Sequence, residues 1–213
     1  MPAGSPAPVV LGIDPGLTRC GVGAVRGPVS RPRMVHAACV RTPSDLPVEQ
    51  RLLRLHTALE ALVAELEPAA VAVERVLFSG NVRTAMPTGQ AAGVALLVAA
   101  AHGLPVVAYS PNEVKQTVTG DGRADKDAVA RLVAAQLALD APPRPVDVTD
   151  ALAVALTHLA HRRGPDAGAI ATPARVALAS AAADAARDGR GGWEAVVAAR
   201  SAQPSGRPRG DAA

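Results

Sequence analysis

The chain has 213 residues, of which 49% are hydrophobic, enough to build a buried core. Its longest apolar run, residues 91–101, is too short to cross a bilayer, which needs about 20 residues, so composition excludes a membrane-spanning protein. The formal net charge of +3 and the isoelectric point near 9.4 point only weakly to a polyanionic partner.

No export signal is visible at the start of the sequence. Residues 1–8 lack the basic stretch and the apolar region of a signal peptide. Cys20 and Cys39 show neither CxxC spacing nor a metal-like cluster. We therefore expect a cytoplasmic protein whose two thiols are reduced and structural.

The first apolar run ends in a single carboxylate. Residues Val9–Gly16 read Val-Val-Leu-Gly-Ile-Asp-Pro-Gly, a buried strand that delivers Asp14, and Pro15-Gly16 has the pattern of a type II turn. Cys20–Arg26 and Met34–Val40 are predicted to be the next two strands. The sequence thus predicts an antiparallel meander with an acid at the end of its first strand.

The same pattern recurs after the first helix. Leu46–Leu66 carries a stripe of leucines in steps of three and four, which predicts an amphipathic helix that Pro68 ends. Ala69–Val73 is then predicted to be a short buried strand that delivers Glu74. Two apolar strands therefore end in acids.

A second long helix is predicted over Asn81–His102. Gly89 and Gly93 lie four residues apart on one of its faces. This face suits close packing against the sheet, and it suits equally a close contact between two subunits. The sequence leaves both interpretations open.

Three more helices follow the strand Leu104–Tyr109. Ser110-Pro111-Asn112-Glu113 has the pattern of a capping box and opens a short helix with Lys115. Lys126 lies in the first turn of the helix Asp125–Leu139. Asp147–Arg163 is predicted to be the last helix, with His158 in a structural role.

Composition divides the chain near residue 163. From Gly164 onward it shifts to Ala, Gly, Arg, Pro and Ser. We expect a catalytic domain over residues 1–163 and a low-complexity tail over residues 164–213 that is disordered or partly helical.

The acids are the strongest chemical signal. Asp14, Glu74, Asp147 and Asp150 lie at two strand ends and on one face of a helix, from which they could converge on one point. Like charges at close range raise one another's pKa, so such a cluster needs a cation. Mg²⁺ or Mn²⁺ suits oxygen ligands, and acids of this kind support two-metal hydrolysis of phosphodiesters.

Each acid also has an ordinary explanation. Asp14 could accept hydrogen bonds from its own turn, and Glu74 could be a solvated strand end. Asp147 and Asp150 could be an N-cap and a first-turn acid that complement the helix dipole. Taken jointly, two acids that end apolar strands favour a site.

Several segments closely resemble the RuvC family of Holliday junction resolvases. They are Leu11–Gly16, Val73–Val76, Gly89–Ala95, Val114–Gly120 and Asp147–Ala153. The resemblance runs from about Val9 to His161 and implies an α/β fold of the RNase H-like type, with a five-stranded mixed sheet flanked by helices. It implies an endonuclease that makes paired symmetric nicks in four-way DNA junctions, in DNA recombination and repair.

The resemblance also implies site residues, a cofactor and partners. Asp14, Glu74, Asp147 and Asp150 match the family's metal-binding catalytic acids, and Lys115 and Lys126 match its basic positions near the active site. Two Mg²⁺ ions per subunit, replaceable by Mn²⁺, would serve catalysis. The partners would be a second copy of the chain and the RuvA–RuvB branch-migration complex.

The loop after Glu74 departs from the family. Members usually carry a Phe three residues after the Glu, where this chain has Leu77, and the aromatic residue is Phe78. Either side chain could wedge into the junction. The alternative is that Phe78 packs against the long helix. Arg75 and Arg83, which flank the loop, are further candidates for DNA contact.

Two rival functions begin from the same residues. Sugar kinases and actin-like ATPases also open with a strand, an Asp and a Gly-containing hairpin, but they need a second phosphate hairpin that we do not find here, and the chain has no GxxxxGK[ST] loop. A junction-binding protein without catalysis would not need the acids. Both rivals are therefore disfavoured.

Overall fold

The computed structural model describes residues 7–76 and 82–162, and for residues 82–84 it describes the backbone alone. Its strands are β1 (Val9–Asp14), β2 (Arg19–Arg26), β3 (Arg33–Arg41), β4 (Ala70–Glu74) and β5 (Val106–Tyr109). They form a five-stranded sheet in the order β3-β2-β1-β4-β5. The first three strands are antiparallel, whereas β4 and β5 run parallel to β1. The predicted mixed sheet with its meander is confirmed.

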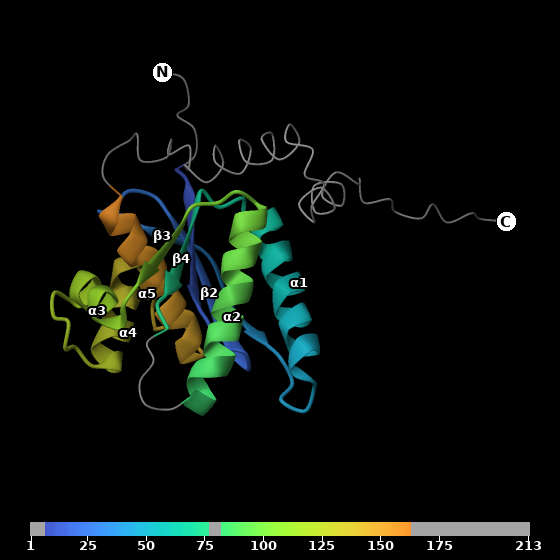
Figure 1. The fold of residues 1–213 in the computed structure, drawn as a ribbon. Helices are drawn as coiled ribbons and strands as arrows, with labels where there is room; N and C mark the ends of the chain where they lie inside the picture. The colour runs from blue at the N-terminus through green and yellow to red at the C-terminus, as the bar shows by residue number, and fades with distance from the viewer. Residues whose placement is uncertain (1–6, 77–81, 163–213) are drawn as a thin grey trace, which may run out of the picture. The chain divides into compact units, whose positions relative to one another are not determined.

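Helices cover both faces of this sheet (Figure 1). They are α1 (Val48–Leu66), α2 (Val82–Ala101), α3 (Pro111–Thr119), α4 (Lys126–Gln136) and α5 (Val146–His161). Helices α1 and α2 lie side by side on one face, and α3, α4 and α5 gather on the other (Figure 1). None of the helices in the described part of the chain is long and apolar enough to cross a membrane.

The sheet divides the apolar side chains into two cores because successive strand residues point to opposite faces. Val10 and Ala72 belong to the core under α5, whereas Leu11, Ile13 and Val71 belong to the core under α1 and α2. Asp14 and Glu74 follow Val10 and Ala72 at even spacing. The alternation therefore directs both acids to the α5 face.

The ends of the helices agree with the local sequence. At the start of α3, Ser110 Oγ accepts a hydrogen bond from Glu113 N at 3.3 Å, and Glu113 Oε2 accepts one from Ser110 N at 2.7 Å. The predicted capping box is confirmed. Helix α1 ends where Glu67 turns left-handed, with φ of 43°.

The predicted type II turn at Pro15-Gly16 is wrong. That turn needs a positive φ at Gly16, and the glycines with positive φ in the described ranges are Gly27, Gly103 and Gly120. A Cβ on Gly16 would instead collide with the carbonyl oxygen of Arg19. Glycine is required here because the chain passes close to itself.

The glycine face of α2 does not pack against the sheet. The sheet-facing residues of α2 are Ala91, Ala95, Val98 and Ala99, and a Cβ on Gly89 or Gly93 would meet nothing within 4 Å. The first of the two interpretations of these glycines is therefore wrong. Contact with a second subunit stays a prediction.

Both cysteines are free thiols, and Cys20 is buried. Burial is the main reason that the pKa of the Cys20 thiol is raised to about 12, so the thiol stays protonated. This agrees with the structural role predicted for it.

Candidate active site

Asp14 and Glu74 end two neighbouring parallel strands. The residues before them, Ile13 and Val73, are partners in the β1–β4 register, so the two acids emerge at the same end of the sheet. The two carboxyl groups lie close enough to shift each other's pKa. Asp14 therefore does not simply cap its own turn, and Glu74, which is half-buried, is not a fully solvated strand end.

Helix α5 brings the other two acids to this point. Asp147 lies in its first turn and Asp150 lies one turn further on. The N-cap position is Pro145, which makes no side-chain capping bond, so Asp147 is not the N-cap that the ordinary explanation required. All four acids, Asp14, Glu74, Asp147 and Asp150, are half-buried.

Glycines in β1 and β2 allow α5 to lie directly on the sheet. A Cβ on Gly12 would come within 2.8 Å of Ala155 N, and one on Gly23 would come within 2.8 Å of Leu152 N. A Cβ on Gly21 would collide with the backbone of Asp147. The helix thus contacts the strands backbone to backbone, which sets the depth at which Asp147 and Asp150 lie.

The electrostatics identify Asp14 as the centre of the cluster. Its pKa is raised to about 8, first by burial and then by the nearby charges of Glu74, Asp150 and Asp147. Burial also raises the pKa of Glu74, and Asp150 adds to that rise. Without a bound cation, the Asp14–Glu74 pair therefore retains a proton at neutral pH.

Two cations lie against the acids of α5. Lys126 Nζ is 3.3 Å from Asp150 Oδ2, and this carboxylate is the main cause of the raised pKa of Lys126. Arg19 Nε is 3.4 Å from Asp147 Oδ2. The structure thus places Lys126 beside Asp150. Lys115 lies half-buried on α3 and forms no ion pair with any described residue.

Sequence reasoning missed Arg19. An arginine at the start of a strand looks like a solvated surface residue, and no motif marked it. The available signal was its position: β2 returns antiparallel to β1, with Asp14 opposite Gly21, and Arg19 lies two residues before Gly21 on the same face. Only the position of α5 in the structure shows that Asp147 lies next to Arg19.

The acids suit divalent metal ions in their chemistry. Carboxylate oxygens are the ligands that Mg²⁺ and Mn²⁺ prefer. Asp147 Oδ2 is buried and has no hydrogen-bond partner, so it has an unused acceptor position. Within the described ranges, no group of three or more His, Cys, Asp or Glu side chains is placed so that it could hold a metal ion. The acids fit a divalent metal through the chemistry of their donor atoms.

The structure describes only some of the other residues predicted to contact DNA. Leu77 and Phe78 lie outside the described residues, and so does the side chain of Arg83. Arg75 is exposed, and its Nη2 donates a hydrogen bond to Ala108 O at 3.1 Å. The guanidinium of Arg75 is thus partly used in tying β4 to β5.

His158 has the structural role predicted for it. Its Nδ1 is 3.0 Å from Tyr109 Oη, which links α5 to the end of β5. Burial lowers the pKa of His158. It is two turns beyond Asp150, about 12 Å along the helix axis, so it does not reach the acids.

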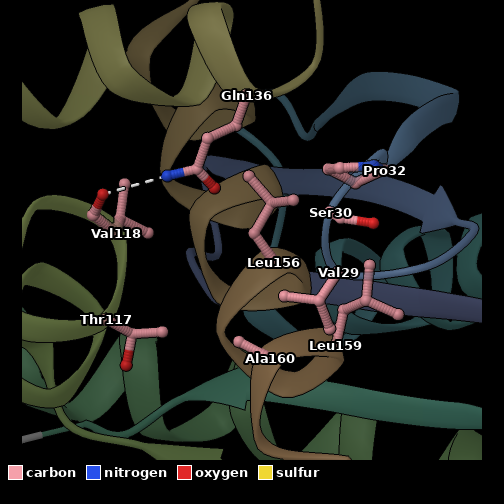
Figure 2. A pocket seen from close by; sticks show the side chains of 9 residues that line it. All are labelled: Val29, Ser30, Pro32, Thr117, Val118, Gln136, Leu156, Leu159 and Ala160. Carbon is pink, nitrogen blue, oxygen red and sulfur yellow. Dashed lines mark hydrogen bonds between the residues drawn. The ribbon is translucent and has the colours of Figure 1, made fainter.

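A cavity of about 290 Å³ lies away from the acids. Its lining includes Val29, Ser30, Gln136 and Leu159, and Gln136 Nε2 donates to Val118 O at 3.0 Å (Figure 2). None of the acids lines it. The open cluster at the sheet end, and not this cavity, is the candidate active site.

A comparison with known protein families distinguishes between the nuclease, kinase-like and junction-binding interpretations of the sequence. The family model of crossover junction endodeoxyribonuclease RuvC matches residues 10–158. The chain belongs to the RuvC family. Curated RuvC proteins are similar over most of their length: that of Streptomyces avermitilis is 52% identical over 151 residues, 70% of this chain and 86% of the relative. That of Salinispora arenicola is 51% identical over 183 residues, 85% of this chain and 98% of the relative.

Solved structures agree with this family. Thermus thermophilus RuvC in complex with a Holliday junction substrate matches with a TM-score of 0.68 and 40% identity, over 71% of this chain and 92% of that one. A yeast mitochondrial Holliday junction resolvase matches with a TM-score of 0.55 at 12% identity, which supports the fold alone. The RNase H-like fold is confirmed. The alternative of a sugar kinase or actin-like ATPase is therefore rejected.

Membership of the RuvC family defines the chemistry of the cluster. The chain is a crossover junction endodeoxyribonuclease, a hydrolase that acts on DNA. The family is one of metal-dependent nucleases, which agrees with the unused acceptor on Asp147 and the raised pKa of Asp14. A protein that binds junctions without cutting them is therefore excluded.

Proposed function

We propose that this enzyme resolves four-way DNA junctions by paired symmetric nicks, through two-metal hydrolysis without a covalent intermediate. The observation that carries the proposal is the convergence of Asp14, Glu74, Asp147 and Asp150 at one end of the sheet. The biological setting is DNA recombination and repair, and the enzyme acts in the cytoplasm, where the chromosome of a bacterial cell lies.

Each acid has a distinct part in this proposal. The charges of the other three acids all raise the pKa of Asp14, so Asp14 would hold both ions. The remaining ligands would be Glu74, Asp147 and Asp150. The ions are Mg²⁺, with Mn²⁺ as a substitute. When bound, they activate the attacking water and stabilise charge on the leaving oxygen. Asp14 and Glu74 lose their shared proton as the site fills.

Basic residues would hold the DNA backbone beside the acids. Lys126 lies against Asp150, from where its exposed amino group can reach a phosphate. Lys115, Arg75 and Arg83 are further candidates for backbone contacts. Because these contacts release counterions from DNA, we expect affinity for the junction to fall as salt rises.

The loop that contains Leu77 and Phe78 would contact the unstacked centre of the junction. Leu77 and Phe78 follow Glu74 by three and four residues in the sequence. An apolar or aromatic side chain that inserts between adjacent base pairs partly unstacks them and stabilises a kink in the nucleic acid. We propose Phe78 as the wedge, with Leu77 as the alternative.

Paired nicks require two active sites, and α2 offers a surface for a second subunit. Met86 and Leu97 are each 60% exposed, and Leu96 is 46% exposed. Gly89 and Gly93 have open space above them, which lets another backbone approach closely. We therefore propose a homodimer through α2. The RuvA–RuvB complex is the proposed functional partner, by analogy with the family.

The nuclease would occupy residues 1–163. The family match ends at residue 158 and the last described helix ends at His161, which supports this boundary. The low-complexity tail expected over residues 164–213 lies outside the described residues.

Cleavage of a synthetic four-way junction, with Mg²⁺ and with EDTA, tests the proposal. The wild type should cut only with the metal, and the Asp14→Asn variant should not cut although it folds. Robust cleavage by the folded Asp14→Asn variant would remove the catalytic assignment. Metal-independent cleavage by the wild type would remove the metal mechanism.

A further inference from the structure

Arg19 contacts Asp147 of the candidate active site. Neither the family resemblance nor the proposed mechanism gives Arg19 a role. Its Nε is 3.4 Å from Asp147 Oδ2, the buried oxygen that has no hydrogen-bond partner. The contact is thus an ion pair without a hydrogen bond. Arg19 therefore holds Asp147 Oδ2 by charge alone, and a divalent cation bound to this oxygen would replace the guanidinium there.

The backbone holds Arg19 and Asp147 opposite each other. Gly21, two residues after Arg19, lies directly against the backbone of Asp147, where no Cβ would fit. Thr18, the residue before Arg19, accepts a hydrogen bond from Arg51 Nη2 at 2.7 Å and its carbonyl accepts one from Thr42 N at 3.2 Å. The backbone on both sides of Arg19 is therefore held in place, which keeps its side chain within reach of Asp147.

An arginine in this place has one property that a lysine or histidine lacks. Its guanidinium presents N–H donors in a planar fork that suits both a carboxylate and a phosphate oxygen. The side chain of Arg19 is 56% exposed, whereas that of Asp147 is 20% exposed. The guanidinium can consequently swing toward solvent while the carboxylate stays in place.

We propose that Arg19 is a positioning residue: it is the counter-cation that holds Asp147 in the metal-free enzyme and yields that carboxylate when a divalent ion binds. This inference rests on the proposed metal site. Arg19 keeps Asp147 oriented and its charge compensated, and it competes with the metal for the same oxygen. Once displaced, the guanidinium remains at the open side of the site, where a phosphate oxygen of the DNA is its matching acceptor.

Binding of Mn²⁺ to the DNA-free protein, followed by electron paramagnetic resonance of the free ion, tests this competition. The Arg19→Gln variant should bind Mn²⁺ about threefold to tenfold more tightly, because the substitution removes the repulsion between the guanidinium and the metal ion. The effect stays in this range because the ion pair is partly exposed and therefore weak. The Arg19→Lys variant keeps the charge and should stay near the wild type.

Arg41 supplies a matched control. It is the cross-strand partner of Arg19 in the β2–β3 register, it is exposed, and it pairs with no acid in the described part of the chain. The Arg41→Gln variant should bind Mn²⁺ within about twofold of the wild type, because a screened charge acts weakly at longer range.

The possible outcomes distinguish a failure of the proposed competition between Arg19 and the metal from a failure of the proposed metal site. If Arg19→Gln binds Mn²⁺ no more tightly than the wild type, or if Arg41→Gln tightens binding equally, the competition is refuted while the metal site stands. If the wild type binds no Mn²⁺ at all, the proposed metal site fails and the competition fails with it.

Discussion

Gly21 of β2 lies directly against the backbone of Asp147, with no room for a side chain between the strand and the helix. Gly12 and Gly23 make the same close contact further along α5. The position of the two α5 acids relative to Asp14 therefore depends on the absence of a Cβ at these strand positions. Side-chain packing alone does not determine it.

Replacing Gly21 by alanine should damage the site more than the fold. The new methyl group must push the first turn of α5 outward, which moves Asp147 away from Asp14. We expect a loss of about 1–3 kcal/mol in the free energy of unfolding. The single-turnover cleavage rate should fall by about a hundredfold or more, since misplacement by about 1 Å has that effect.

Gly122→Ala is the control for that substitution. Its nearest neighbour would be Asn112 O at 3.5 Å, an ordinary contact. It should cleave at close to the wild-type rate. A Gly21→Ala variant that cleaves equally well would show that α5 does not need its contact with β2.

The stability of the metal-free enzyme should fall as pH rises. The pKa of Asp14 is raised from 3.8 to about 8, so between these values the folded state keeps a proton that the unfolded state has released. This contribution to stability is full below about pH 4 and is lost as pH rises to about 8. Thermal melts in EDTA from pH 5 to 9 measure it.

Asp14→Asn removes this titration and should be more stable than the wild type at pH 8 in EDTA. A gain of about 1–2 kcal/mol corresponds to roughly 2–8 °C in Tm for a chain of this size. Mg²⁺ should narrow the difference because it stabilises only the wild-type cluster. Equal melting temperatures at pH 8 in EDTA would mean that Asp14 lies outside a crowded acid cluster.

Lys126 should affect the rate of cleavage at saturating DNA. Its amino group lies at Asp150, within reach of the charge that develops on the phosphate. We expect Lys126→Ala to slow single-turnover cleavage by about tenfold to a hundredfold. Arg131→Ala, on the exposed side of the same helix, should stay within about twofold. Equal effects of the two substitutions would reduce Lys126 to a general contributor to DNA affinity.

The α2 surface should control the oligomeric state. Leu97→Glu places a charge at a side chain that is 60% exposed and should convert a dimer into a monomer. Light scattering after size exclusion measures this. Leu53→Glu on α1, where the leucine is 64% exposed, should leave the dimer intact. A dimer that survives Leu97→Glu would place the interface elsewhere.

Phe78 should matter for junctions and not for folding. Phe78→Ala should reduce junction cleavage at unchanged melting temperature, and Leu77→Ala should have a smaller effect. Unchanged cleavage by Phe78→Ala would remove the aromatic wedge. Loss of cleavage with Leu77→Ala alone would assign the wedge to Leu77.

Much of the fold and the acid cluster is readable from the sequence because it depends on local patterns. Asp14 and Glu74 follow apolar strand runs, and Asp147 and Asp150 have helical spacing. Arg19 and the role of Gly21 were not predictable, because both depend on where α5 crosses the sheet. Gly16 misled for a different reason: a Pro-Gly pair predicts a type II turn, whereas glycine is needed here because Arg19 O passes close to it.

Mapping of nicks on a four-way junction with each strand labelled tests the central claim most directly, with a linear duplex of matched sequence beside it. With Mg²⁺, we expect symmetric nicks in two strands of like polarity, confined to the junction and absent from the duplex. Equal cutting of junction and duplex, or nicks without symmetry, would contradict it.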